Sequence, residues 1–82
     1  MKRYFVLRSI QHIVAYDLKH KDPEDYQELH DFLNNLHAIK IQKSVWTLKS
    51  KRTSKELLDQ LKNHIKKDDK ILVSQVIDLE SN

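Results

Sequence analysis

The apolar residues of this chain occur in short segments that follow two different periodicities. Residues 13–16 (IVAY) and 45–48 (VWTL) are compact, partly β-branched apolar runs, and they predict two central strands. Residues 39–42 (IKIQ) alternate between isoleucine and polar side chains, which is typical of a half-buried edge strand. Residues 71–77 (ILVSQVI) predict a further strand near the end of the chain.

Two other segments repeat apolar residues every three or four positions, the spacing of an amphipathic helix. The first begins at Pro23, which follows the capping residue Asp22 and stands at the first helical position, and it ends near Leu36. The second begins at Thr53, which has the spacing of a capping box with Glu56. The chain therefore places one helix between the first two strands and one before the last.

The predicted order over residues 12–77 is strand, helix, strand, strand, helix, strand. This order favours an α+β ferredoxin-like sandwich, in which two helices cover one face of a four-stranded antiparallel sheet. Residues 1–11 form an N-terminal extension, and residues 78–82 form a short polar tail. Three placements of the extension are open: it prolongs the first strand, it pairs with the edge of the last strand, or it is a loose tail.

The first strand is apolar on both of its faces. Ile13 and Ala15 point to one side, and Val14 and Tyr16 point to the other. The uncovered face of a two-layer sandwich is normally polar, so a second cover is needed. We expect a homodimer that packs through the sheets. The alternative is a face that is partly exposed or covered by residues 1–11.

Composition narrows the classes of function. The chain has no cysteine, which excludes a disulfide framework, a thiolate zinc site and a cysteine nucleophile. Its 39% of hydrophobic residues argue against disorder, and the apolar run of residues 4–7 is too short for a signal peptide. We therefore expect a cytoplasmic protein. The formal net charge of +3 favours contacts with phosphate groups, although lysines also cover ordinary solvated surfaces.

Three segments together resemble a known family: HIVAYDLK at residues 12–19, IQKSVWTLKS at 41–50 and DDKILV at 68–73. They are similar to the small CRISPR-associated spacer-acquisition nucleases of the Cas2 type and to their stand-alone relatives, the VapD-type toxins and the SinR-like proteins. The SVWTL form is most similar to the SinR-like group. Residues 78–82 differ from the CRISPR members, because they are too few and too polar for the additional strand that those members exchange with a partner.

The resemblance implies a ferredoxin-like fold, a homodimer built by packing sheets together, and a Mg²⁺ ion held near the dimer axis by the aspartate that ends the first strand. That aspartate is Asp17, identified through the pair Tyr16-Asp17. Ser44 matches the serine of the third-strand motif, and Trp46 stands where relatives often carry phenylalanine.

Asp17 has two interpretations. One carboxylate cannot make a good magnesium site, but two copies of Asp17 near a dimer axis would supply the two carboxylates that such sites use. Asp17 would then be both the metal ligand and the catalytic residue. The alternative is that it caps the loop after the strand, which also accounts for an aspartate at this position.

Further site residues follow from charge and position. We expect a nucleic-acid-binding group whose cations position a phosphate backbone without reading its sequence, namely Lys19, Lys21, Lys40, Lys43, Lys49 and Arg52. We assign a second group to the dimer interface, namely Ile13, Ala15, Ser44 and Trp46. For Trp46, packing in the core is favoured over stacking on a base.

Two functions from different classes follow. The first is a homodimeric Mg²⁺-dependent endonuclease that cuts RNA or DNA. The second is a non-catalytic dimer that binds nucleic acid or a protein, such as a phage or mobile-element regulator of host defence.

Overall fold

The computed structural model describes residues 9–20 and 23–77. The predicted cap at Asp22, the proposed phosphate contact at Lys21, most of the N-terminal extension and the tail at 78–82 lie outside the described residues. Within the described part, the first strand begins at Ile10, so that the end of the predicted extension prolongs this strand.

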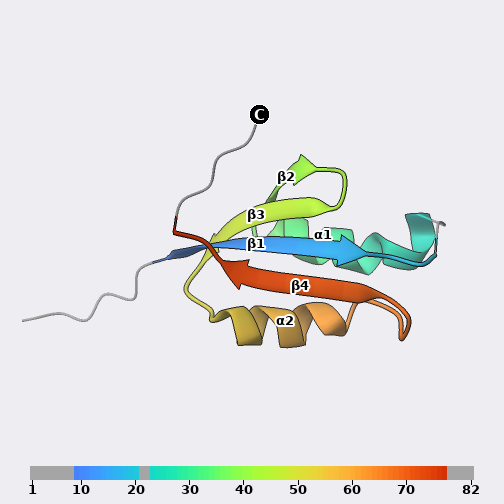
Figure 1. The fold of residues 1–82 in the computed structure, drawn as a ribbon. Helices are drawn as coiled ribbons and strands as arrows, with labels where there is room; N and C mark the ends of the chain where they lie inside the picture. Colours follow the sequence, from blue (N-terminus) through green and yellow to red (C-terminus); the bar gives the residue numbers. More distant parts are fainter. Residues whose placement is uncertain (1–8, 21–22, 78–82) are drawn as a thin grey trace, which may run out of the picture.

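The secondary structure follows the predicted order (Figure 1). Its elements are β1 (Ile10–Asp17), the 3₁₀ helix η1 (Pro23–Tyr26), α1 (Gln27–Asn35), β2 (Ile39–Gln42), β3 (Val45–Ser50), α2 (Ser54–Lys62) and β4 (Lys70–Gln75). The sheet has the strand order β2-β3-β1-β4, and every neighbouring pair is antiparallel. The ferredoxin-like α+β fold is therefore confirmed, with β1 and β3 central as expected.

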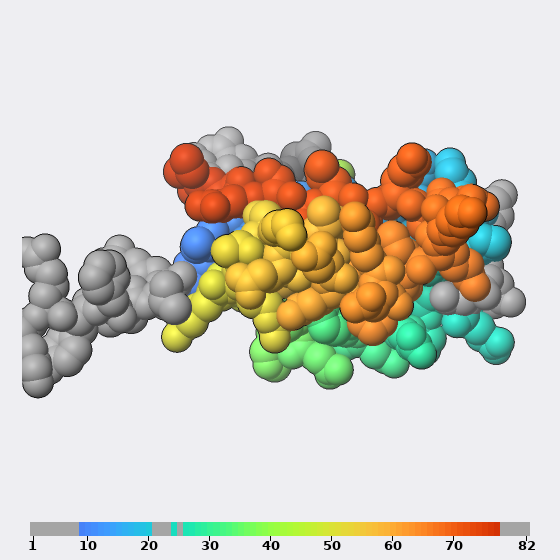
Figure 2. Space-filling view, turned by 90° about the horizontal axis from the view of Figure 1, so that it is seen from below, coloured from blue at the N-terminus to red at the C-terminus, as the bar shows by residue number. Residues whose placement is uncertain are grey.

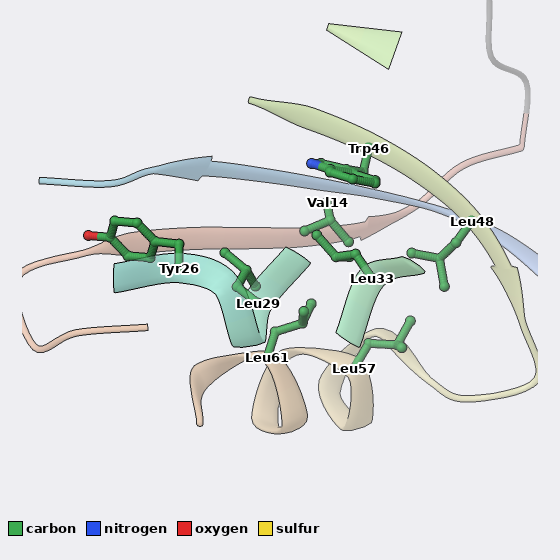
Figure 3. Close-up of a cluster of buried hydrophobic side chains, with 8 residues drawn as sticks. All are labelled: Val14, Tyr26, Leu29, Leu33, Trp46, Leu48, Leu57 and Leu61. Atoms are coloured by element: carbon green, nitrogen blue, oxygen red, sulfur yellow. The ribbon is translucent and has the colours of Figure 1, made fainter. Parts of the chain in front are cut away.

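The register of the sheet assigns each side chain to one of two faces. Val14 pairs with Trp46 on β3 and with Val73 on β4, and Val14 and Trp46 are buried beneath the helices. The next position, Ala15, pairs with Val45 and Leu72, and its side chain lies on the opposite face. We call this opposite face, which α1 and α2 do not cover, the open face. Figure 3 shows both helices on the same side of the strands.

The core lies between this sheet and the two helices. Each helix contributes two fully buried leucines, Leu29 and Leu33 from α1 and Leu57 and Leu61 from α2. They point toward one another and toward the sheet in Figure 3. In Figure 2, α2 lies across the molecule, with α1 along one side of it and β4 along the other. Full burial stabilises the fold by roughly 2 kcal/mol for each leucine.

The helix starts agree with the sequence to different degrees. The capping box is confirmed: the Thr53 hydroxyl accepts a hydrogen bond from the Glu56 amide, and the Glu56 carboxylate accepts one from the Thr53 amide, each at 3.1 Å. The first helix begins differently, because its first turn at Pro23–Tyr26 is 3₁₀ and the α-helix starts only at Gln27. Such tight turns are common at helix ends.

The first helix ends without glycine. The Ala38 amide donates to the Leu33 carbonyl at 3.0 Å and the His37 amide donates to the Asn34 carbonyl at 3.0 Å, which is the pattern of a Schellman motif. The motif requires a left-handed residue after the cap, and here His37 takes that conformation with φ of 59°. This conformation crowds the Cβ atom of any residue other than glycine.

We expect His37→Gly to stabilise the protein by about 0.5–1 kcal/mol. Glycine adopts this conformation without the Cβ clash, and this gain exceeds the cost of the greater freedom of glycine in the unfolded chain. Urea denaturation would show a higher midpoint at an unchanged slope. His37→Ala is the matched control, since alanine keeps the Cβ atom and should bring no gain. Equal stability of the two variants would contradict the assignment.

A candidate site at the end of strand β1

Asp17 is the last residue of β1, as the sequence predicts. It pairs with Lys70 at the start of β4 and shares the open face with Ala15. Its side chain is 69% exposed, and Oδ2 lies 3.2 Å from the ammonium of Lys19, which donates a hydrogen bond to it. The carboxylate is therefore accessible to a ligand, but it already has one cationic partner.

The turn between β2 and β3 meets this end of β1. The Tyr16 amide donates to the Ser44 carbonyl at 3.1 Å, which places the predicted serine next to the predicted aspartate. A surface hollow lined by Tyr16, Asp17, Leu18, Lys43 and Ser44 results. A second hollow flanks Asp17 on the β4 side and is lined by Ala15, Tyr16, Asp17, Lys70, Ile71 and Leu72. Asp17 thus stands between two hollows at the edge of the open face.

The loop that follows Asp17 is tied down by a residue that the sequence analysis did not single out. Asp69 is only 7% exposed, and its Oδ1 accepts hydrogen bonds from the Lys19 amide and the Tyr26 hydroxyl, each at 2.8 Å. Its Oδ2 accepts a third from the Lys66 amide, also at 2.8 Å. The Tyr26 hydroxyl in turn accepts a bond from the His20 amide at 3.2 Å. We call this set of bonds the Asp69 anchor.

The anchor also determines the charge state of its carboxylate. Burial alone would raise the pKa of Asp69, but the hydrogen bonds from the Lys19 and Lys66 amides and from the Tyr26 hydroxyl outweigh it and hold the pKa below its ordinary value. Asp69 is therefore ionised at neutral pH. One signal of it was visible in the sequence: like Asp17, it is an acid at the boundary of an apolar strand.

A single copy of the chain does not supply a magnesium site. Mg²⁺ requires near-octahedral oxygen ligands and usually takes one or two carboxylates. In residues 9–20 and 23–77, no three histidine, aspartate or glutamate side chains gather as a metal-binding group. Lys19 and Lys70 beside Asp17 also compete with a cation for the carboxylate. The residues fit a metal only if a second copy adds its own Asp17.

The proposed phosphate contacts within residues 9–20 and 23–77 do not form one cluster. Lys19 and Lys43 lie at the Asp17 end of β1 and are exposed. Lys49 pairs with Gln11 near the beginning of the same strand, and Arg52 follows the end of β3 and is half-buried. Lys40 pairs with Trp46, so it points to the helix side of the sheet rather than to the open face. Among the members of this group that the structure describes, the fold thus brings only Lys19 and Lys43 next to Asp17.

The expected interface residues also divide between the faces. Ile13 and Ala15 are half-buried on the open face, and Ser44 lies at the turn between β2 and β3, next to Tyr16. Trp46 lies on the other face: it is 7% exposed, and its indole N–H donates to the Tyr16 hydroxyl at 2.9 Å. Its ring stacks on His30, with 6.2 Å between the ring centroids. The assignment of Trp46 to the dimer interface is therefore wrong, because the register turns it into the core.

Fold and site together define a class: a small ferredoxin-like protein with an exposed aspartate at the end of its first strand. The particular family follows from comparison with known proteins. The model of the CRISPR associated protein Cas2 family matches residues 10–80, and the chain belongs to this family. A search of curated proteins finds no match. The closer likeness to the SinR-like group stays a prediction.

The helices carry one further finding. Among the described residues, none of them is both long and apolar enough to cross a membrane.

Proposed function

We propose that two copies of this Cas2 family protein pack through their open faces and form a metal-dependent endonuclease, with one Asp17 from each copy near the twofold axis. The observation that carries the proposal is the position of Asp17: it is exposed, it ends a central strand, and it lies on the face that neither helix covers. Family membership supports the same dimeric arrangement through the resemblance described above.

The open face has the composition of a surface that another subunit covers. Ile39 is 65% exposed and Leu72 is 59% exposed, while Ile13 and Ala15 lie between them on the central strand. Exposed apolar side chains that share one face mark an interaction site. A twofold interface would place the same patch on both copies.

The chemistry follows from the residues at this edge. Lys19 and Lys43 would hold a phosphodiester by its charge, without reading bases. The two Asp17 carboxylates would hold Mg²⁺, which when bound offsets negative charge on the phosphate and lowers the pKa of a water ligand. The carboxylates would have to exchange their lysine partners for the metal, and Lys19 would then be released toward the phosphate.

A second function is favoured by a specific contact. The Asp17–Lys19 ion pair already satisfies part of the carboxylate, as expected of a surface on which Asp17 has only a structural role. In that case the dimer would bind nucleic acid or a protein without cutting, as a regulator of host defence would.

Incubation of the protein with labelled single-stranded RNA and double-stranded DNA, in Mg²⁺, in Mn²⁺ or in EDTA, separates the two functions. The nuclease proposal expects cleavage that requires the metal. Binding without cleavage, weakened by rising salt, would favour the second function, since contacts to phosphates are lost as salt increases. If the protein shows no cleavage and no binding, both nucleic-acid proposals are contradicted.

The dimer has a test of its own. Ile13→Glu places a carboxylate in the middle of the open face, and its unpaired burial should weaken dimerisation by roughly 3 kcal/mol, about 100-fold in Kd. Light scattering or sedimentation velocity at micromolar concentration should show twice the chain mass for the wild type and the monomer for the variant. Asn34→Glu makes the same charge change on the exposed surface of α1 and should stay dimeric. A monomeric wild type would overturn the proposed arrangement.

A further inference from the structure

The Asp69 anchor joins three segments: the loop after β1, the end of η1 and the loop that leads to β4. Its carboxylate binds the Lys19 amide after β1, the Tyr26 hydroxyl at the end of η1 and the Lys66 amide in the loop that leads to β4. All three bonds measure 2.8 Å, and the carboxylate is nearly excluded from solvent. Hydrogen bonds to an ionised acceptor are about twice as strong as neutral ones.

The anchor begins where the sheet ends. The ladder between β1 and β4 runs up to the pair Asp17 and Lys70, so the sheet holds the backbone of Asp17 itself. Asp69 immediately precedes Lys70, and its side chain reaches past the last sheet pair to the amide of Lys19. The conformation of the loop at residues 18–20 is therefore set by the anchor rather than by the sheet.

This loop carries Lys19. Among residues 9–20 and 23–77, its side chain is the one that forms a hydrogen bond and ion pair with the Asp17 carboxylate. The ammonium of Lys19 lies 3.2 Å from Oδ2 of Asp17, while the amide of the same residue is bound by Asp69. A second tie, from the His20 amide to the Tyr26 hydroxyl, ends on a group that Asp69 also holds. Two tethered amides on neighbouring residues fix the backbone of the loop, so the Lys19 side chain starts from a set position beside Asp17.

We propose that Asp69 is a positioning residue for the Asp17 site: by binding the Lys19 amide and the Tyr26 hydroxyl, it fixes the backbone of the loop after β1. The Lys19 ammonium is thereby kept at the Asp17 end of the strand, on the Asp17 carboxylate in the metal-free protein and within reach of a phosphate once a metal replaces it. The importance of this arrangement for cleavage rests on the proposed function. The position of Lys19 can be measured whether or not the protein cleaves, so the two claims are tested separately.

The reactivity of Lys19 toward an acylating reagent reports directly on the anchor. Brief acetylation followed by mass spectrometry compares Lys19 with the exposed Lys67 in the same sample. Tyr26→Phe removes one hydroxyl and keeps the ring in the core, and Asp69→Asn removes the charge. Both should raise the relative reactivity of Lys19 by about twofold to fivefold, the range of an exposed ion pair. Asp17→Asn removes the partner itself and defines the upper limit.

Asp68→Asn is the matched control, because Asp68 is the exposed neighbour of Asp69 and the charge change is identical. It should leave the reactivity of Lys19 at the wild-type value. Circular dichroism of each variant shows whether it is folded. Unchanged reactivity of Lys19 in folded Tyr26→Phe and Asp69→Asn would overturn the proposal.

The value of kcat per folded molecule distinguishes a positioning role from a purely structural one, because a purely structural role would leave it unchanged. In a cleaving wild type, Tyr26→Phe should lower kcat by about tenfold per folded molecule at a nearly unchanged KM, because a loosened loop misplaces the Lys19 ammonium relative to the reacting phosphate. An unchanged kcat would overturn the positioning role. A wild type that does not cleave, together with raised reactivity of Lys19 in the variants, would refute the proposed nuclease and leave the anchor supported.

Discussion

Replacement of Asp17 by asparagine should abolish metal-dependent cleavage, with a loss of at least about 100-fold, or about 2.7 kcal/mol of transition-state stabilisation. Asparagine keeps the size of the side chain and removes the charge that would hold the cation. In a dimer, both copies of the carboxylate are lost at once, and Lys19 and Lys70 then leave the site net positive. The fold should be unaffected, because the side chain is 69% exposed.

The measurement is initial rates on labelled RNA and DNA with Mg²⁺, with Asp68→Asn as the control for an exposed acid. Mixing equal amounts of wild type and Asp17→Asn gives a sharper result. If both carboxylates serve one site, only homodimers of the wild type cleave. After subunit exchange, the mixture should then show about one quarter of the activity of the same total amount of wild-type protein. Half of the activity would indicate that each copy works alone. Full cleavage by the pure variant would exclude Asp17 as the metal ligand.

Asp69→Ala should destabilise the protein by about 3 kcal/mol, because it leaves the Lys19 and Lys66 amides and the Tyr26 hydroxyl without their buried acceptor. A domain of this size has only about 4–12 kcal/mol to lose. Urea denaturation at pH 7 measures the change. Asp68→Ala, at the exposed neighbouring position, should stay within about 0.5 kcal/mol of the wild type. A similar loss in both variants would contradict the role of the anchor.

The same bonds predict how wild-type stability depends on pH. The anchor holds the pKa of Asp69 below its value in the unfolded chain, so the carboxylate contributes its stability above that value. The contribution should be lost progressively as the pH falls from about 4, the ordinary range of an aspartate, through the lower pKa of the folded state. Denaturation midpoints across this range should fall more steeply for the wild type than for Asp69→Ala.

The sequence predicts helix ends correctly where the interactions that determine them join residues only a few positions apart. The capping box of Thr53 and Glu56 needs only a spacing of three residues, and the structure contains both of its hydrogen bonds. The end of α1 was placed correctly near Leu36 although glycine is absent, because the leucine periodicity stops there and His37 supplies the left-handed residue. The start of α1 was placed too early, because the first turn at Pro23–Tyr26 is 3₁₀.

Prediction of the site was partial for a related reason. The position of Asp17 on the last residue of a central strand follows from the apolar run before it, and the structure agrees. Its lysine partner was assigned only to phosphate binding, since nothing local shows that Lys19 turns back to Asp17. Asp69 is not among the predicted site residues, because two of its three partners lie in other segments and one of them is 50 residues away in the sequence.

The sequence by itself determined the kind and order of the strands and helices, the family, and the strand end that carries the acid, because periodicity and capping act over a few residues. The tertiary structure alone decided which face each side chain takes and which acid is buried. Trp46 enters the core because the register pairs it with Val14. Asp69 stays ionised because two donors from distant segments join the nearby Lys66 amide at its carboxylate. Such contacts depend on how separate segments pack, and no short stretch of residues encodes that.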